Sequence, residues 1–206
     1  MSSDDDEREF RLQRGLHILN NVLSYQDALD ALLGCCSSHA WAEAVLAMRP
    51  FIHHDQLQDA SLNVWNDRDQ IGVEQLLEAI ASHPRIGDRS ASSSNTLADT
   101  FSENEQRAVL ELESSSRVLQ ELAELNERYW DKFGFVFLIC ASGKAPEFML
   151  EQLRTRLENS REDELVHARD EQAKITQLRI DKLLLDLGLV HVGSPRGKRC
   201  PTNSLL

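Results

Sequence analysis

Apolar residues recur every three or four positions through most of the chain, which is the spacing of amphipathic helices. Ser24 and Ser160, each followed three residues later by an aspartate, resemble capping boxes at two helix starts. Pro146 suits the first turn of another helix, and Gly188 suits a helix end. Together these signals predict helical segments over residues 10–19, 28–33, 40–48, 57–65, 67–81, 102–126, 146–158 and 160–187.

Residues 133–141 form the most apolar run of the chain and do not follow the helical spacing. By composition they suit a buried strand, but no other segment alternates as a partner strand would. We therefore expect a buried helix end or an extended core segment there. The sequence predicts an all-α fold: a single compact domain of about eight helices over residues 10–190, between a disordered acidic arm (1–9) and a flexible basic tail (191–206).

Composition narrows the possible partners. The chain has 206 residues, 41% of them hydrophobic and 27% charged, as in ordinary soluble domains. Its net charge of −12 argues against nucleic acid, because phosphate binding needs a basic surface. No apolar run is long enough to span a membrane, and the acidic start does not resemble a secretion signal. We expect neither a nucleic-acid nor a membrane partner.

The remaining polar groups indicate neither a metal site nor a disulfide framework. His53 and His54 form the only histidine cluster and have no acidic or cysteine partner at helical ligand spacing. Arg156, Lys174 and Lys182 fit solvated charges on helices. The cysteines have no disulfide-framework spacing, which indicates reduced thiols in an intracellular protein; they are Cys35, Cys36, Cys140 and Cys200.

Three side chains are candidates for chemistry. His83 follows a helical pattern that Pro84 stops, so it is either a catalytic group at an element end or an ordinary surface or capping residue. Glu105 stands three residues after Ser102, which fits a capping box as well as a proton-transfer group. Arg179 has apolar helix neighbours and therefore needs an anion, which a protein carboxylate or a substrate carboxylate would supply.

These pieces together resemble one family, 2-oxo-4-hydroxy-4-carboxy-5-ureidoimidazoline (OHCU) decarboxylase, over about residues 24–187. In residues 133–141 and 174–179 the sequence is most similar to the decarboxylase domain of plant-type allantoin synthases. The resemblance rests on the order and spacing of short motifs: Leu33 to Ser38, Arg49-Pro50-Phe51, His83-Pro84, Ser102-x-x-Glu105-Gln106, Leu125-Asn126-x-x-Tyr129, Lys132 to Ala141, and Lys174 to Arg179.

The resemblance implies an all-α, cofactor-independent carboxy-lyase that converts OHCU to (S)-allantoin and CO2 in urate and purine degradation. It implies a catalytic constellation of His83, Glu105 and Arg179 and no metal. The residues that it implies for substrate binding are Pro84, Ser102, Glu103, Asn104, Gln106, Phe137, Leu138, Ile139, Cys140 and Ala141. Family members often form homodimers, so a homodimer is a further expectation.

From the family chemistry we expect His83 to donate a proton, with a pKa near its ordinary value of about 6.5. Glu105 would hold the substrate hydroxyl or ureido group and orient His83 or raise its pKa. Arg179 would hold an anionic group, and backbone amides near residues 137–141 would bind ring oxygens. Two other hypotheses stay open: a non-enzymatic helical interaction domain, and a related lyase for another small ureido carboxylate. The ending Ser204-Leu205-Leu206 loosely resembles a peroxisomal signal, so we expect either cytoplasm or peroxisome.

Overall fold

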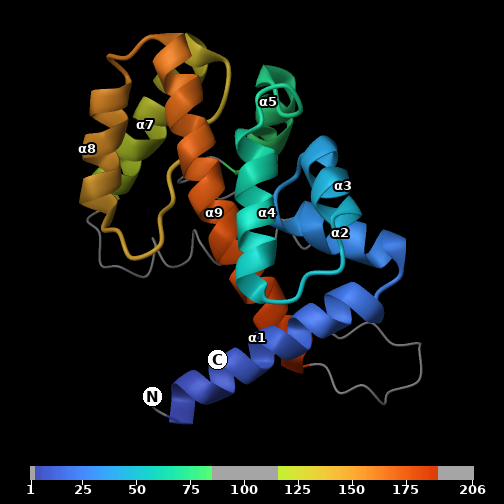
Figure 1. Ribbon diagram of the computed structural model, residues 1–206. Coiled ribbons are helices and arrows are strands. Elements are labelled where there is room, and N and C mark those ends of the chain that lie inside the picture. Colours follow the sequence, from blue (N-terminus) through green and yellow to red (C-terminus); the bar gives the residue numbers. More distant parts are fainter. Residues whose placement is uncertain (1–2, 85–115, 190–206) are drawn as a thin grey trace.

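The computed structural model describes residues 3–84 and 116–189, and over these ranges it contains eight α-helices and no strand (Figure 1). The predicted all-α fold is therefore confirmed. The helices are α1 (Ser3–Asn21), α2 (Tyr25–Cys35), α3 (His39–Ala47), α4 (His54–Asn66), α5 (Val73–Ala81), α7 (Ser116–Phe133), α8 (Pro146–Arg156) and α9 (Arg161–Leu189). Both predicted serine caps are present, since the backbone amides of Asp27 and Asp163 each donate to the preceding serine hydroxyl at 3.1 Å.

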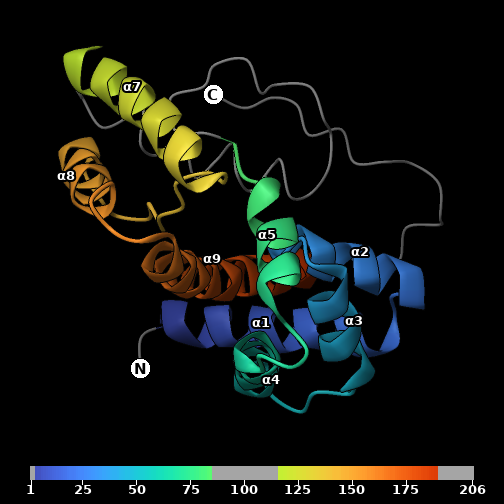
Figure 2. The ribbon, with the colours of Figure 1, turned by 90° about the horizontal axis from the view of Figure 1, so that it is seen from above.

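Helix α9 is the element on which the others converge. It packs against α1, α2, α4 and α5, whereas α7 and α8 pair with each other at one end of the molecule (Figure 2). Its 29 residues give it a length of about 44 Å, enough to cross a small domain. One helix therefore contacts both the α1–α5 part and the part that contains α7 and α8.

Two glycines allow α1 and α9 to approach backbone to backbone. A Cβ atom added at Gly15 would overlap the carbonyl oxygen of Leu184, and one added at Gly188 would overlap that of Arg11. Gly188 was expected to end its helix, but α9 continues to Leu189. The role of Gly188 is therefore close packing against α1, which the local sequence does not reveal.

The acidic segment expected to be a disordered arm is helical from Ser3 onward, so that prediction is corrected. Asp4, Asp5 and Asp6 stand in the first turn of α1, where negative charge interacts favourably with the helix dipole. Arg8 then forms an ion pair with Asp181 of α9 at 2.9 Å, which fixes this end of α1. The tail predicted over 191–206 lies outside the described residues.

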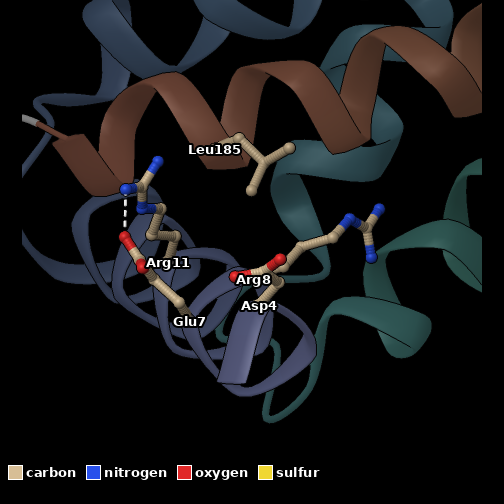
Figure 3. Close-up of a pocket in the computed structure, with 5 residues that line it drawn as sticks. All are labelled: Asp4, Glu7, Arg8, Arg11 and Leu185. Carbon is tan, nitrogen blue, oxygen red and sulfur yellow. Dashed lines mark hydrogen bonds and ion pairs between the residues drawn. The ribbon is translucent and has the colours of Figure 1, made fainter. Parts of the chain in front are cut away.

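An open hollow lies beside this first part of α1 (Figure 3). Its lining holds equal numbers of acidic and basic side chains and one apolar residue: Asp4, Glu7, Arg8, Arg11 and Leu185. Glu7 and Arg11 pair with each other, and Arg8 pairs with Asp181. Because these charges compensate one another, the hollow has no net preference for a charged ligand.

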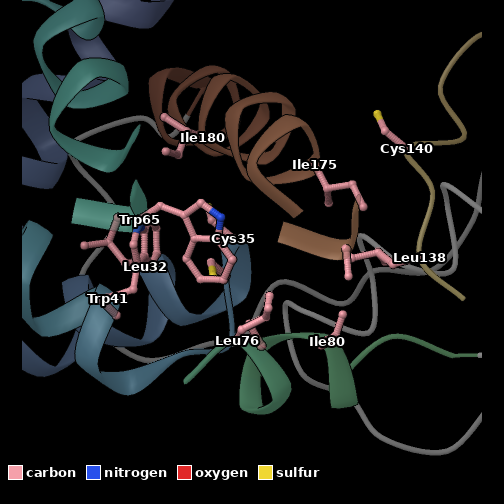
Figure 4. Packing of buried hydrophobic residues seen from close by; sticks show 14 of the residues in the cluster. Leu32, Cys35, Trp41, Trp65, Leu76, Ile80, Leu138, Cys140, Ile175 and Ile180 are labelled. Atoms are coloured by element: carbon pink, nitrogen blue, oxygen red, sulfur yellow. The ribbon is translucent and has the colours of Figure 1, made fainter. Parts of the chain in front are cut away.

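The core lies where α2, α3, α4 and α5 meet α9, and it extends to the segment that follows α7 (Figure 4). Gly134, with φ of 77°, allows the chain to turn sharply at the end of α7. Residues 135–140 then run as a buried segment without helix or strand. Of the two expected alternatives, this confirms the extended core segment, and its Leu138 and Cys140 belong to the same hydrophobic core as Ile175 of α9 (Figure 4).

Candidate functional site

His83 lies just past the end of α5 and points into the protein. Its backbone amide donates to the carbonyl of Ile80 at 3.1 Å, and the following Pro84 disfavours continuation of the helix. The residue is only 8% exposed, and its Nε2 lies 2.9 Å from Oε1 of Gln172 on α9. The alternative of a surface histidine is therefore wrong, since this side chain is buried against α9.

Arg179 stands two turns further along α9 and is 2% exposed. Its charge acts on His83 and on the thiols of Cys35 and Cys36 at the end of α2. The structure thus places His83 and Arg179 within electrostatic reach of each other in the interior. An arginine cannot lose its charge when it is buried, so the region keeps a fixed positive charge.

This environment changes the protonation of His83. Burial, and secondly the charge of Arg179, lower the pKa of His83 to about 3, although the hydrogen bond to Gln172 acts in the opposite direction. The imidazole is therefore neutral near pH 7 in the unliganded protein. The expectation of a proton donor with an ordinary pKa has to be corrected, because an imidazolium here would lose its hydration and face a guanidinium.

The neighbouring cysteines are not nucleophiles. Burial raises the pKa of both Cys35 and Cys36 far above neutral pH, and the charge of Arg179 offsets only part of that increase. Among the described residues both are free thiols, as is Cys140, and their reduced state in the cell stays a prediction. Within residues 3–84 and 116–189 no cluster of three His, Cys, Asp or Glu side chains is placed to hold a metal ion.

The segment of residues 137–141 is held in place by side chains from α8, from α9 and from the loop before α8. The amide of Cys140 donates to Oε2 of Glu171 at 2.7 Å, which ties the segment to α9. The carbonyl of Leu138 accepts from Nη1 of Arg156 on α8 at 2.8 Å, and that of Cys140 accepts from Nζ of Lys144 at 2.6 Å. Its backbone is thus fixed by polar contacts on both sides.

Arg156 belongs to a buried polar network that the sequence did not reveal. The prediction that it is solvated is wrong, because it is 6% exposed and pairs with Glu164 at 2.8 Å. Tyr129 donates a short hydrogen bond to the same carboxylate, and the guanidinium stacks 4.7 Å from the ring centroid of Phe137. No spacing rule links these residues, since they come from α7, α8, α9 and the segment after α7. Lys174 is exposed and pairs with Glu171, as a solvated helix charge does.

Of the predicted site residues, those just after α5, on α9 and in residues 137–141 can be placed. Pro84 lies half-buried beside His83, and residues 137–140 are buried with Ala141 half-buried at their end. The remaining predicted residues lie outside the described ranges: Ser102, Glu103, Asn104, Glu105 and Gln106. The choice between cap and catalytic group for Glu105 therefore stays a prediction.

The arrangement combines a fixed positive charge with a neutral imidazole. A buried guanidinium supplies permanent positive charge, and a neutral imidazole can accept a proton. Helix α9 contributes Arg179 directly and holds His83 through Gln172. It also holds residues 137–141 through Glu171. Gln172 and Glu171 were not predicted as site residues. Their only sequence signal is their place on the same helix as Arg179.

The chain is similar to known proteins in sequence and in fold. Residues 21–181 match the family model of OHCU decarboxylase. The chain is 40% identical over 152 residues to the uric acid degradation bifunctional protein TTL of Arabidopsis thaliana, covering 74% of this chain and 46% of that protein. It is 31% identical over 162 residues to 2-oxo-4-hydroxy-4-carboxy-5-ureidoimidazoline decarboxylase of Haloferax volcanii. The match covers 78% of this chain and 90% of that protein.

A crystal structure of OHCU decarboxylase in the presence of (S)-allantoin is similar, with a TM-score of 0.63 and 35% identity over 75% of this chain and 97% of that one. The chain spans less than half of the bifunctional relatives, 46% of the Arabidopsis protein and 32% of PucL of Bacillus subtilis. The family model nevertheless covers well over half of the chain. The chain therefore belongs to the OHCU decarboxylase family.

Proposed function

We propose that the protein decarboxylates OHCU to (S)-allantoin and CO2, a step of urate degradation. The observation that carries this proposal is the burial of His83 beside the fixed charge of Arg179 in a chain of this family. Similarity to a structure solved in the presence of (S)-allantoin supports the same reaction.

The reaction needs little chemistry from the protein. The carbon that carries the carboxylate also carries a hydroxyl group and lies next to the ureido-bearing ring carbon. When the bond to the carboxylate breaks, CO2 leaves and the electron pair moves through the adjacent imine onto its ring nitrogen, which takes up one proton from solvent. The hydroxyl then loses its proton to become the ring carbonyl, and the ureido-bearing carbon gains a proton. Because the ring itself accepts the electron pair, we propose that no cofactor takes part.

Arg179 is the group that we assign to substrate orientation. Its buried guanidinium would bind an anionic group of the substrate by two parallel hydrogen bonds, which fixes position as well as charge. The amides of residues 137–141 would meet the ring oxygens. The amide of Cys140 donates to Glu171 in the unliganded protein, so its use by substrate would require that carboxylate to give way.

His83 is the group that we assign to proton transfer. As a neutral imidazole it can accept the hydroxyl proton and then return a proton to the adjacent carbon from one side, which yields one enantiomer. A substrate carboxylate paired with Arg179 would offset the charge that now lowers the pKa of His83. Substrate binding would thus raise the pKa of His83 toward the range in which it can hold a proton briefly.

Glu105 completes the proposed constellation, with Ser102, Glu103, Asn104 and Gln106 as further substrate contacts. These roles rest on the family resemblance, because residues 85–115 lie outside the described structure. We propose that the Glu105 carboxylate orients the substrate hydroxyl or ureido group. A glutamine at this position would still serve as a cap, which separates the two roles experimentally.

The test of the function generates OHCU freshly from urate with uricase and a hydroxyisourate hydrolase, adds this protein and follows circular dichroism. Rapid formation of an optically active product is expected, and His83→Asn should abolish it while the protein stays folded. A trace that matches the reaction without this protein would refute the assignment.

We also propose a homodimer. Large apolar side chains are exposed where α1 meets α2 and just after α3, namely Val22, Tyr25, Met48 and Ile52. Light scattering after size exclusion would test this by the mass of the particle.

No helix among the described residues is long and apolar enough to cross a membrane. We propose the cytoplasm or the peroxisome as the location. Microscopy of a fusion with a free C-terminus would separate the two.

A further inference from the structure

We propose that Gln172 is a positioning residue for the reaction: its carbonyl holds the Nε2–H tautomer of His83, so that Nδ1 is the nitrogen that exchanges the proton. The inference rests on the proposed function for its catalytic meaning. The assignment of the His83 tautomer rests on the contacts of Gln172 alone.

Gln172 belongs to a chain of buried hydrogen bonds. Its Oε1 lies 2.9 Å from Nε2 of His83, and its Nε2 donates to Oγ1 of Thr176, one turn further along α9, at 3.1 Å. Thr176 also lies near the thiol of Cys36 at the end of α2, whose pKa it lowers against the effect of burial. Gln172 is fully buried and Thr176 nearly so. These hydrogen bonds thus run from His83 to Thr176 without reaching solvent.

The order of donors in this chain defines the tautomer. The amide nitrogen of Gln172 donates to the hydroxyl oxygen of Thr176. The amide carbonyl then faces His83 and can only accept. The facing Nε2 must therefore carry the hydrogen, and in the neutral ring the lone pair lies on Nδ1.

An amide suits this role better than the carboxylate that often orients catalytic histidines. A carboxylate would stabilise the imidazolium strongly, so the ring would hold the proton that it has to return to carbon. The neutral amide accepts from Nε2–H in both protonation states and leaves the basicity of Nδ1 low. The charged group that acts on His83 within the described residues is Arg179, and burial keeps the nearby thiols of Cys35 and Cys36 protonated.

A packing role alone does not account for Gln172. A fully buried amide carries a desolvation cost that only its hydrogen bonds offset, so leucine would fill a purely structural position at lower cost. Neither of its two partners is an obligatory backbone group, because one is the imidazole of His83 and the other the hydroxyl of Thr176. The bonds of Gln172 therefore serve the orientation of the imidazole.

The test compares Gln172→Leu and Gln172→Glu with Gln177→Leu as matched control. Gln177 lies on the same helix but bonds to α4, at Gln58 and Ser61. Nitrogen-15 NMR of the histidine rings should show hydrogen on Nε2 of His83 in the wild type and in the control, and a mixture of tautomers in Gln172→Leu. In the decarboxylation assay Gln172→Leu should lose about tenfold or more in kcat with little change in KM.

Gln172→Glu tests the argument on basicity. The new carboxylate should raise the pKa of His83 by at least about one unit, and the acidic limb of the pH profile of kcat should move to higher pH with it.

Unchanged kcat and an unchanged tautomer in Gln172→Leu would overturn the inference. If the wild type does not decarboxylate OHCU, the proposed function fails, while the NMR comparison still decides whether Gln172 sets the tautomer. If Gln172→Leu does not fold, the Gln172→Glu profile decides, and an unshifted limb overturns the proposal.

Discussion

The buried, neutral His83 should make the stability of the protein depend on pH in a way that a single substitution removes. The native pKa of about 3 lies below the ordinary value of 6.5. Between these values the unfolded chain binds a proton at His83 that the native protein does not bind. Native stability therefore falls as the pH decreases through this window, and the loss begins near pH 6.5.

The magnitude follows from the two pKa values. At pH 5 the difference in proton binding costs the native state about 2 kcal/mol relative to pH 7.5. The replacement His83→Gln keeps an amide nitrogen near the position of Nε2, where it can donate to Gln172, but it does not titrate. The free energy of unfolding of this variant should therefore gain about 2 kcal/mol on that of the wild type between pH 7.5 and pH 5.

Urea denaturation at pH 7.5, 6 and 5 measures this difference directly, because both proteins share all other titrating groups. His39→Gln is the control: its side chain is 66% exposed and pairs with Glu78, so its removal should not reproduce the gain at pH 5. Parallel stability curves for wild type and His83→Gln would show that the imidazole is not held neutral by the fold, and would refute the reasoning about burial and Arg179.

Three further predictions concern packing at Gly15, the buried network of Arg156, and Glu105. Gly15→Ala should lower the free energy of unfolding by about 3 kcal/mol or prevent folding, because its methyl group would overlap the carbonyl of Leu184; thermal unfolding measures this. Arg156→Met should cost about 3–5 kcal/mol, because it leaves the carboxylate of Glu164 buried without its cation. The double replacement with Glu164→Leu should recover much of that loss in urea denaturation. Glu105→Gln should lose decarboxylation at an unchanged melting temperature, and retained turnover would contradict its catalytic role.

The helices were predictable because their signals are local. Ser24 and Ser160 cap the helices that they were expected to cap, and Pro146 opens α8 as expected. Gly188 shows where local reasoning fails. A glycine near a predicted helix end fits a C-cap, whereas its actual neighbour is the backbone of Arg11, almost the whole chain away in sequence.

The site was predictable only in part and for a similar reason. His83 and Arg179 could be named from family motifs, and both are buried as the proposed site requires. The pKa of His83 could not be named, because it depends on burial and on a charge that approaches through tertiary structure. Arg156 was taken for a solvated charge because its burial depends on Glu164 and on the carbonyl of Leu138, which no helical pattern places beside it.

Helix α9 explains how a histidine outside any helix can be held with the accuracy that proton transfer needs. Just before α5 begins, the guanidinium of Arg169 on α9 donates to the carbonyl of Ile71 at 2.7 Å. Just after α5 ends, Gln172 of the same helix meets His83. Both ends of α5 are thus bound to neighbouring turns of α9, the helix that also carries Arg179. A displacement of α5 would have to break contacts with α9 at both ends. The distance between imidazole and guanidinium is therefore a property of one rigid unit, and catalysis by orientation requires this rigidity.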